Sequence, residues 1–133
     1  MTKIALQNDP AVTTAAAAIL KEMKSVSVSL VYAAFLTDDG FDVAALPSRV
    51  TDGQRFASMA SSMQALSDAV AHELRIGAGE YLIISSAQGY VIQLRVPTSL
   101  VVLSALFDND ATVGAALALT RSYAAKMAVI LAA

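Results

Sequence analysis

Three segments of this chain are apolar at consecutive positions instead of at every second one. The clearest is the run from Leu100 to Leu103, and the predicted strands at 25–37 and 81–86 share the pattern. Successive side chains of a strand point to opposite faces of its sheet, so a strand of this kind is covered on both faces. The sequence therefore predicts a sheet with helices on both sides, an α/β sandwich of three layers.

Turn and capping residues divide the chain into helices and strands. Asp9 before Pro10 is typical of a helix start, and Gly77 and Gly79 are expected to end the second helix. Short loops between the last three strands predict an antiparallel meander. The expected helices are 10–24, 54–75 and 111–131, and the expected strands are 25–37, 41–46, 81–86, 90–96 and 100–107.

This order, α-β-β-α-β-β-β-α, predicts one five-stranded antiparallel sheet with the second helix alone on one face. Capping of the third helix is expected from Asp108-Asn109-Asp110. A length of 133 residues is enough for one domain with a core and too short for two. We therefore expect a single domain over residues 1–133, folded from 10 to 131, with a flexible N-terminus at 1–9.

The second helix carries a continuous apolar stripe, which is the clearest helical signal in the chain. Apolar residues recur every three or four positions over five turns, the spacing that places them on one side of a helix. This stripe is expected to pack on the sheet. It consists of Phe56, Met59, Met63, Leu66, Val70 and Leu74.

The opposite side of the same helix is almost uncharged, whereas an exposed helix usually carries long charged residues there. Small side chains allow another helix to approach closely, so this side is predicted to be a partner interface. Arg49 and Arg55, near the helix start, are the clustered cations expected to help select the partner. The interface side consists of Gln54, Ser58, Ser61, Ala65, Asp68 and His72, with Ser62 and Ala69 on its flank.

Composition also points to protein contacts. Alanine supplies about a fifth of the chain and only 15% of the residues are charged. A small domain with so few charges hides part of its surface in a partner or tends to associate. Nine Lys and Arg against eleven Asp and Glu leave a formal charge of -2, which argues against nucleic acid or an anionic membrane as the partner.

Residues that carry chemistry are scarce. The absence of cysteine excludes disulfides, thiolate metal sites and cysteine nucleophiles. The one histidine, His72, has Asp68 as its helical neighbour, which is too little for a metal or catalytic centre. The Gly77–Gly79 loop follows a helix and precedes a strand, the reverse of a phosphate loop, and the aspartates of 38–42 fit a turn better than a calcium loop. We expect no enzyme activity, no metal and no cofactor.

The N-terminal residues lack the apolar core of a secretory signal. The most apolar stretches, 15–20 and 124–133, are shorter than the roughly 20 residues that cross a bilayer. A cytoplasmic protein without a membrane span is therefore expected.

Taken with the order of elements, five segments resemble the roadblock/dynein light chain 7 family, which includes bacterial regulators of Ras-like GTPases of the mutual gliding protein B type. The resemblance covers about residues 10–131. It rests on the hairpin Ala34–Ala44, the helix segment Arg55–Met63, the strand segments Tyr81–Ile84 and Gly89–Ile92, and a last strand that ends in Asp108.

The resemblance implies the strand order 2-1-5-4-3 and a non-catalytic homodimer. In such a dimer the sheets join through the third strand, here Tyr81, Leu82, Ile83 and Ile84 onward, and the second helices lie side by side. The joined surface would bind a small Ras-like GTPase. A self-associating scaffold without a GTPase partner and a small-molecule sensor are the alternative functions.

Overall fold

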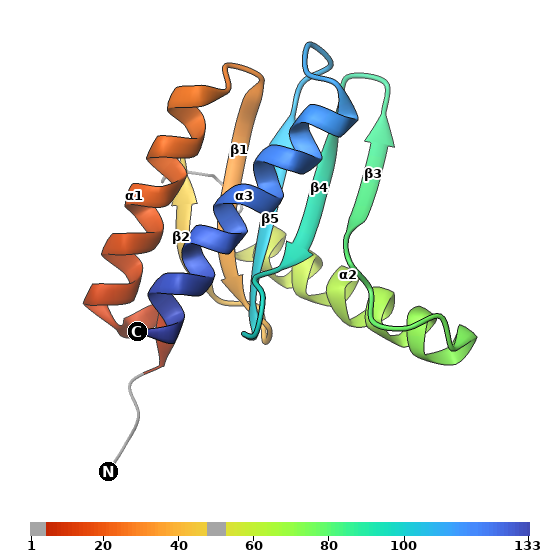
Figure 1. The fold of residues 1–133 in the computed structure, drawn as a ribbon, viewed down its shortest axis with the longest axis horizontal. Helices are drawn as coiled ribbons and strands as arrows, with labels where there is room; N and C mark the ends of the chain where they lie inside the picture. Colours follow the sequence, from red (N-terminus) through yellow and green to blue (C-terminus); the bar gives the residue numbers. More distant parts are fainter. Residues whose placement is uncertain (1–4, 48–52) are drawn as a thin grey trace.

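The computed structural model describes residues 5–47 and 53–133, and its centre is one five-stranded sheet (Figure 1). The strand order is β2-β1-β5-β4-β3, and every neighbouring pair is antiparallel. This order confirms the predicted topology. The strands are β1 (Leu30–Thr37), β2 (Asp42–Leu46), β3 (Leu82–Ser86), β4 (Gly89–Arg95) and β5 (Val101–Phe107).

Helices cover both faces of the sheet, as predicted. The helices α1 (Pro10–Val26) and α3 (Val113–Ala132) lie side by side on one face, and α2 (Gly53–Leu74) lies alone on the other (Figure 1). The two layers differ in size. The main core lies under α1 and α3, whereas the smaller cluster under α2 has only five buried residues, three of them alanines.

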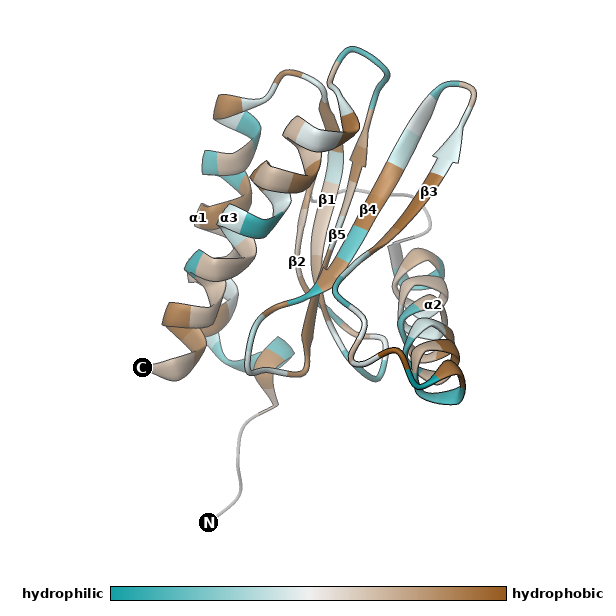
Figure 2. Ribbon diagram, turned by 45° about the vertical axis from the view of Figure 1, so that its right-hand side comes forward, coloured by the Kyte–Doolittle hydropathy of each residue, from teal (hydrophilic) through white to brown (hydrophobic). Residues whose placement is uncertain are grey.

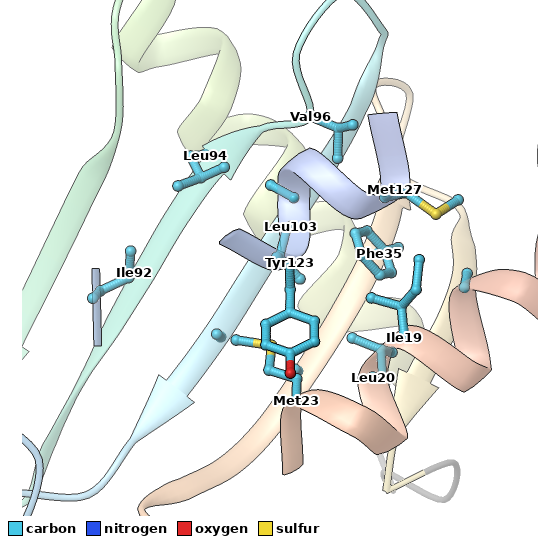
Figure 3. Packing of buried hydrophobic residues seen from close by; sticks show 14 of the residues in the cluster. Ile19, Leu20, Met23, Phe35, Ile92, Leu94, Val96, Leu103, Tyr123 and Met127 are labelled. Carbon is cyan, nitrogen blue, oxygen red and sulfur yellow. The ribbon is translucent and has the colours of Figure 1, made fainter. Parts of the chain in front are cut away.

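Phe35 of β1 lies at the centre of the main core. It is fully buried and lies next to Ile19 from α1 and Met127 from α3 (Figure 3). Leu103 of β5 and Tyr123 of α3 belong to the same cluster. This packing explains why β5 is apolar at every position except Ser104, since it is the central strand and both of its faces are covered.

A short segment before α1 also has regular structure. A 3₁₀ turn, η1 (Leu6–Asn8), precedes α1, and Leu6 packs on the main core. Asp9 caps α1 as predicted, with its carboxylate accepting a hydrogen bond from the Ala11 amide at 3.0 Å. The structured part of the chain therefore begins before Pro10, with apolar contacts made by Leu6.

The helix α1 is longer than predicted, and the strand after it starts later. The alternating Ser25-Val26-Ser27-Val28 run was expected to be strand, yet α1 continues to Val26 and β1 begins at Leu30. Val28 is 90% exposed, so the alternation has no buried face to support a strand. Ser25 instead donates its hydroxyl to the Glu22 carbonyl oxygen, a bond made within a helix.

The start of α3 also differs from the prediction. Thr112, and not the Asp108–Asp110 run, caps the helix, with its hydroxyl accepting from the Ala115 amide at 3.1 Å. Asp108 instead accepts from the Asp110 amide in the preceding turn. By length and apolar composition alone, α3 also meets the usual test for a bilayer-crossing helix, a test that core helices of globular domains pass as well. In this fold α3 packs on the sheet beside α1.

Candidate functional site

The helix α2 contacts the sheet through small and polar residues and not through its apolar stripe. Ala57 and Ala60 are fully buried, and Gln64 and Ala71 are nearly so. Small side chains allow the helix backbone to lie close to the strands. The buried side is therefore rotated by roughly a quarter turn from the predicted one, at 100° per residue.

The apolar stripe itself is mostly exposed, which corrects the prediction that it packs on the sheet. Only Phe56 and Met63 are partly buried, with the Phe56 ring edge-on to Tyr32 at 5.3 Å. The exposed fractions of the other members are large: Met59 54%, Leu66 66%, Val70 47% and Leu74 62%. The periodicity correctly predicted the stripe, but the expectation that the stripe packs on the sheet was wrong.

Polar contacts take the place of apolar ones beneath α2. Gln93 of β4 is completely buried, and its amide donates to the Ala60 carbonyl oxygen at 2.9 Å and to the Gln64 side-chain oxygen at 3.3 Å. Arg95, two residues along the same strand, donates to a carboxylate oxygen of Asp68 at 2.9 Å and to one of Asp38 at 2.7 Å. These contacts tie α2 to β4 and to the β1–β2 turn.

The β1–β2 turn also contacts the first half of α2. The Ser61 hydroxyl donates to the Asp38 carbonyl oxygen at 2.6 Å, and the Gln54 amide donates to the Gly40 carbonyl oxygen at 3.1 Å. Gly40 has φ +95°, and a Cβ there would lie 3.6 Å from the Ser61 side chain. Glycine permits this backbone conformation in the turn next to the helix.

The structure therefore divides the predicted partner interface. Ser61 and Asp68 are partly buried against the β1–β2 turn and β4, so they are less accessible to a partner than the rest of the set. Arg49 lies outside the described residues. The predicted residues that remain exposed on α2 are Gln54, Arg55, Ser58, Ser62, Ala65, Ala69 and His72.

An apolar groove lies between the exposed stripe of α2 and β3. It has a volume of about 740 Å³, and its walls come from α2, the α2–β3 loop and β3. Figure 2 shows hydrophobic residues at the C-terminal end of α2 and in the first part of β3. Both segments contribute to the groove lining. The apolar lining includes Met63, Leu66, Val70, Ile76, Tyr81 and Ile84.

The strand β3 borders the groove and has a free edge. Within residues 5–47 and 53–133 it pairs with β4 alone, and it contains no charge or proline. Tyr81, predicted to belong to this strand, precedes it, and the Arg121 guanidinium lies 5.0 Å from its ring centre. The other edge strand, β2, has the same length as β3, but it has a register irregularity opposite Phe35 and Leu36 and packs against η1 and α1.

Burial shifts the ionisation of two groups on the α2 side of the sheet. Burial, with a smaller contribution from the charge of Asp42, raises the pKa of Tyr32 to about 12. Burial alone raises the pKa of Asp42 above its usual value. One Asp42 carboxylate oxygen has no hydrogen-bond partner among the described residues. Ionised Asp42 is therefore unfavourable to the fold.

Replacing Asp42 with asparagine is expected to raise the melting temperature at pH 7 by a few degrees. Folding raises the pKa of Asp42, so the free energy of unfolding has its full value at a pH below the pKa of the unfolded chain. It decreases as the pH rises through the pKa of the folded state. Asparagine imitates the protonated form, so its advantage should vanish near pH 3. Thermal melts at both pH values make the comparison, and an equal gain at pH 3 would show that the charge is not the cause.

Arg95, Gln93 and Gln64 were missed by the sequence reasoning. A signal was present, since Gln93 and Arg95 are polar at alternate positions of a strand that is otherwise apolar. His72 shares a shallow depression with Asp68, Arg75 and Arg95. Across the described residues, no three His, Asp or Glu side chains gather in a way that could hold a metal.

Comparison with known proteins places the fold. No protein-family model and no curated protein matches the chain. An MglB structure with a tetrameric arrangement has TM-score 0.82 at 18% identity and covers 97% of this chain and 96% of its own. The gliding protein MglB of Thermus thermophilus has TM-score 0.81 at 16% identity, with 97% of each chain covered.

A roadblock/LC7 domain from Streptomyces avermitilis has TM-score 0.79 at 12% identity and covers 88% of this chain and 98% of its own. All three likenesses span nearly the whole of the matched structures. The chain therefore has a roadblock/LC7 fold of the MglB type, as the sequence resemblance predicted.

Proposed function

We propose, from the roadblock/LC7 fold of the MglB type, that this chain is a non-catalytic cytoplasmic regulator or adaptor that forms a homodimer and binds a small Ras-like GTPase through its second helices. The main support for the homodimer is the apolar groove between α2 and β3, which lies next to a free strand edge. An unpaired, uncharged strand is a template for another strand, and a long exposed apolar stripe favours a covered position.

A two-fold pairing of β3 covers both features together. The strands of two copies join edge to edge, and the stripe residues Leu66 and Val70 of each copy enter the shared interface. An interface of this kind buries on the order of 800 Å² per subunit or more. The tetrameric arrangement described for one of the similar MglB structures is consistent with self-association in this fold.

The GTPase-binding surface in this proposal is the outer side of the paired α2 helices. Arg55, Ser58, Ser62, Ala65 and His72 remain exposed there, next to the stripe and outside the groove. Small side chains permit close packing of a partner, while Arg55 and His72 supply polar selectivity. Any effect on hydrolysis comes from ordering the switch segments of the GTPase, because a partner acts through unequal affinity for the two nucleotide states.

Binding of small Ras-like GTPases from the source organism, loaded with GDP or with a GTP analogue, tests this surface. Wild type is expected to prefer one nucleotide state, and Ala65→Arg is expected to weaken binding by about tenfold or more because the long side chain obstructs packing. Ala118→Arg is the matched control, since Ala118 is an exposed alanine on α3, in the opposite layer.

Equal binding by wild type and Ala65→Arg would remove this side of α2 from the contact. No binding by wild type in either nucleotide state would leave the self-associating scaffold as the better account.

A further inference from the structure

The layer between the sheet and α2 is unusually polar. Five buried side-chain polar atoms lack a hydrogen-bond partner among the described residues, and the strand registers place all five residues on the α2 side of the sheet. Unpaired buried polar atoms weaken a packed layer. The five atoms are Tyr32 Oη, Asp42 Oδ1, Gln93 Oε1, Arg95 Nε and Ser104 Oγ.

The C-terminal half of α2 depends on this polar layer for its position. After Met63, its only buried residues are Gln64 and Ala71, and the large apolar residues of this half are exposed. Two side-chain links join this half to the sheet, Gln64 to Gln93 and Asp68 to Arg95. Apolar packing therefore contributes little to the angle at which this part of α2 lies on the sheet.

Arg95 is the residue that connects this half of α2 to two other elements. Its Nη2 lies 2.9 Å from Asp68 on α2 and 2.7 Å from Asp38 in the β1–β2 turn, and its side chain is 31% exposed. An isolated exposed ion pair contributes little, whereas a cation shared by two carboxylates forms a network with defined geometry. Arg95 belongs to β4, the direct neighbour of β3.

We propose that Arg95 is a positioning residue for self-association, which sets the placement of α2 relative to β3 by bridging Asp38 and Asp68. This inference rests on the proposed homodimer. The two-fold interface needs the strand edge and the stripe to fit a second copy at the same time. Asp68 lies between Leu66 and Val70 in the sequence, so a shift of α2 at Asp68 moves both of these stripe residues relative to β3.

Loss of Arg95 is expected to weaken the dimer without removing a residue from the interface. Without Arg95 the C-terminal half of α2 is less fixed on the sheet, so a second copy must immobilise it on binding. The entropy lost in that step makes the free energy of association less favourable. Arg95→Met is expected to raise the dimer dissociation constant by about tenfold, and Arg95→Lys, which retains the charge, is expected to recover part of the loss.

The test combines a double-mutant cycle with hydrogen exchange. Dissociation constants of wild type, Arg95→Met, Asp68→Asn and the double variant are measured by analytical ultracentrifugation. Because the two residues act as a unit, the double variant should be no weaker than Arg95→Met alone. Amide exchange in Arg95→Met should increase over residues 64–74 and stay unchanged in β5. Lys21→Met is the matched control, since it loses the same charge from an exposed position on α1, in the opposite layer.

The outcomes separate this inference from the proposed function. A monomeric wild type at micromolar concentration would overturn the homodimer and this inference with it. A dimeric wild type with an unchanged dissociation constant in Arg95→Met would overturn the role of Arg95 alone. Additive losses in the double variant would also overturn it, because they would show that Arg95 and Asp68 act independently. Increased exchange spread over the whole chain would overturn it as well, because it would indicate general destabilisation.

Discussion

Val70→Glu is expected to give a folded monomer. The Val70 side chain is 47% exposed and lines the apolar groove, so a carboxylate there costs the isolated chain little. In the proposed dimer the same carboxylate would be buried without a partner, and burial of an unpaired charge is strongly unfavourable. The dimer dissociation constant should rise by about a hundredfold or more, which corresponds to roughly 3 kcal/mol.

Ala69→Glu is the matched control for this prediction. It adds the same side chain one residue earlier, on the outer side of α2 and away from the groove. Sedimentation velocity should show a dimer for wild type and Ala69→Glu, and a monomer for Val70→Glu. A dimer formed by Val70→Glu as tightly as by wild type would exclude the groove as the interface.

Phe35→Ala is expected to produce the largest loss of stability in the chain. The ring is fully buried at the centre of the main core, and truncation of such a residue removes apolar contacts and leaves a cavity. The free energy of unfolding should fall by about 3–5 kcal/mol, a large share of the roughly 5–15 kcal/mol of a typical domain. Urea titration followed by circular dichroism measures this change.

Phe41 offers the matched comparison. It stands in the β1–β2 turn with 45% of its surface exposed, so Phe41→Ala removes the same atoms where less area is buried. Its cost should be below about 1 kcal/mol by the usual dependence on burial. Similar losses for the two variants would contradict the assignment of the core.

The exposure of the α2 stripe also changes the effect expected for a charge at Met63. If the stripe on α2 packed on the sheet, Met63→Asp would lower the free energy of unfolding by several kcal/mol through an unpaired buried charge. Met63 is only partly buried and borders the groove, so most of that effect is now expected on association and less on folding.

The sequence predicted a helix or strand well where the residues that determine it are close together in the chain. Asp9 and Pro10 fixed the start of α1, because a cap and a proline act within one turn of the chain. The apolar run of residues 100–103 predicted a strand covered on both faces, and Val101, Val102 and Leu103 of β5 are buried in this way. Leu100 precedes the strand and is exposed.

The orientation of α2 could not be predicted in the same way. A periodic apolar stripe indicates that one side of a helix is buried. The stripe alone does not show whether that side packs on the core of its own chain or on a second chain. The polar partners of α2 were hidden for a related reason. Gln93 lies 29 residues from Gln64 along the chain, and Arg95 lies 57 residues from Asp38, so no local pattern links them.

The two edge strands of the sheet differ in their ability to pair with another chain, and this difference limits the formation of filaments. A chain with two open strand edges adds further chains without limit and becomes a filament. Here β2, which has the same length as β3, has an irregular register and packs against η1 and α1, whereas β3 keeps a regular register with β4 and is the open edge among the described strands. When two β3 edges pair, both are consumed and no template remains for a third strand. Polymerisation through the sheet therefore stops at two chains.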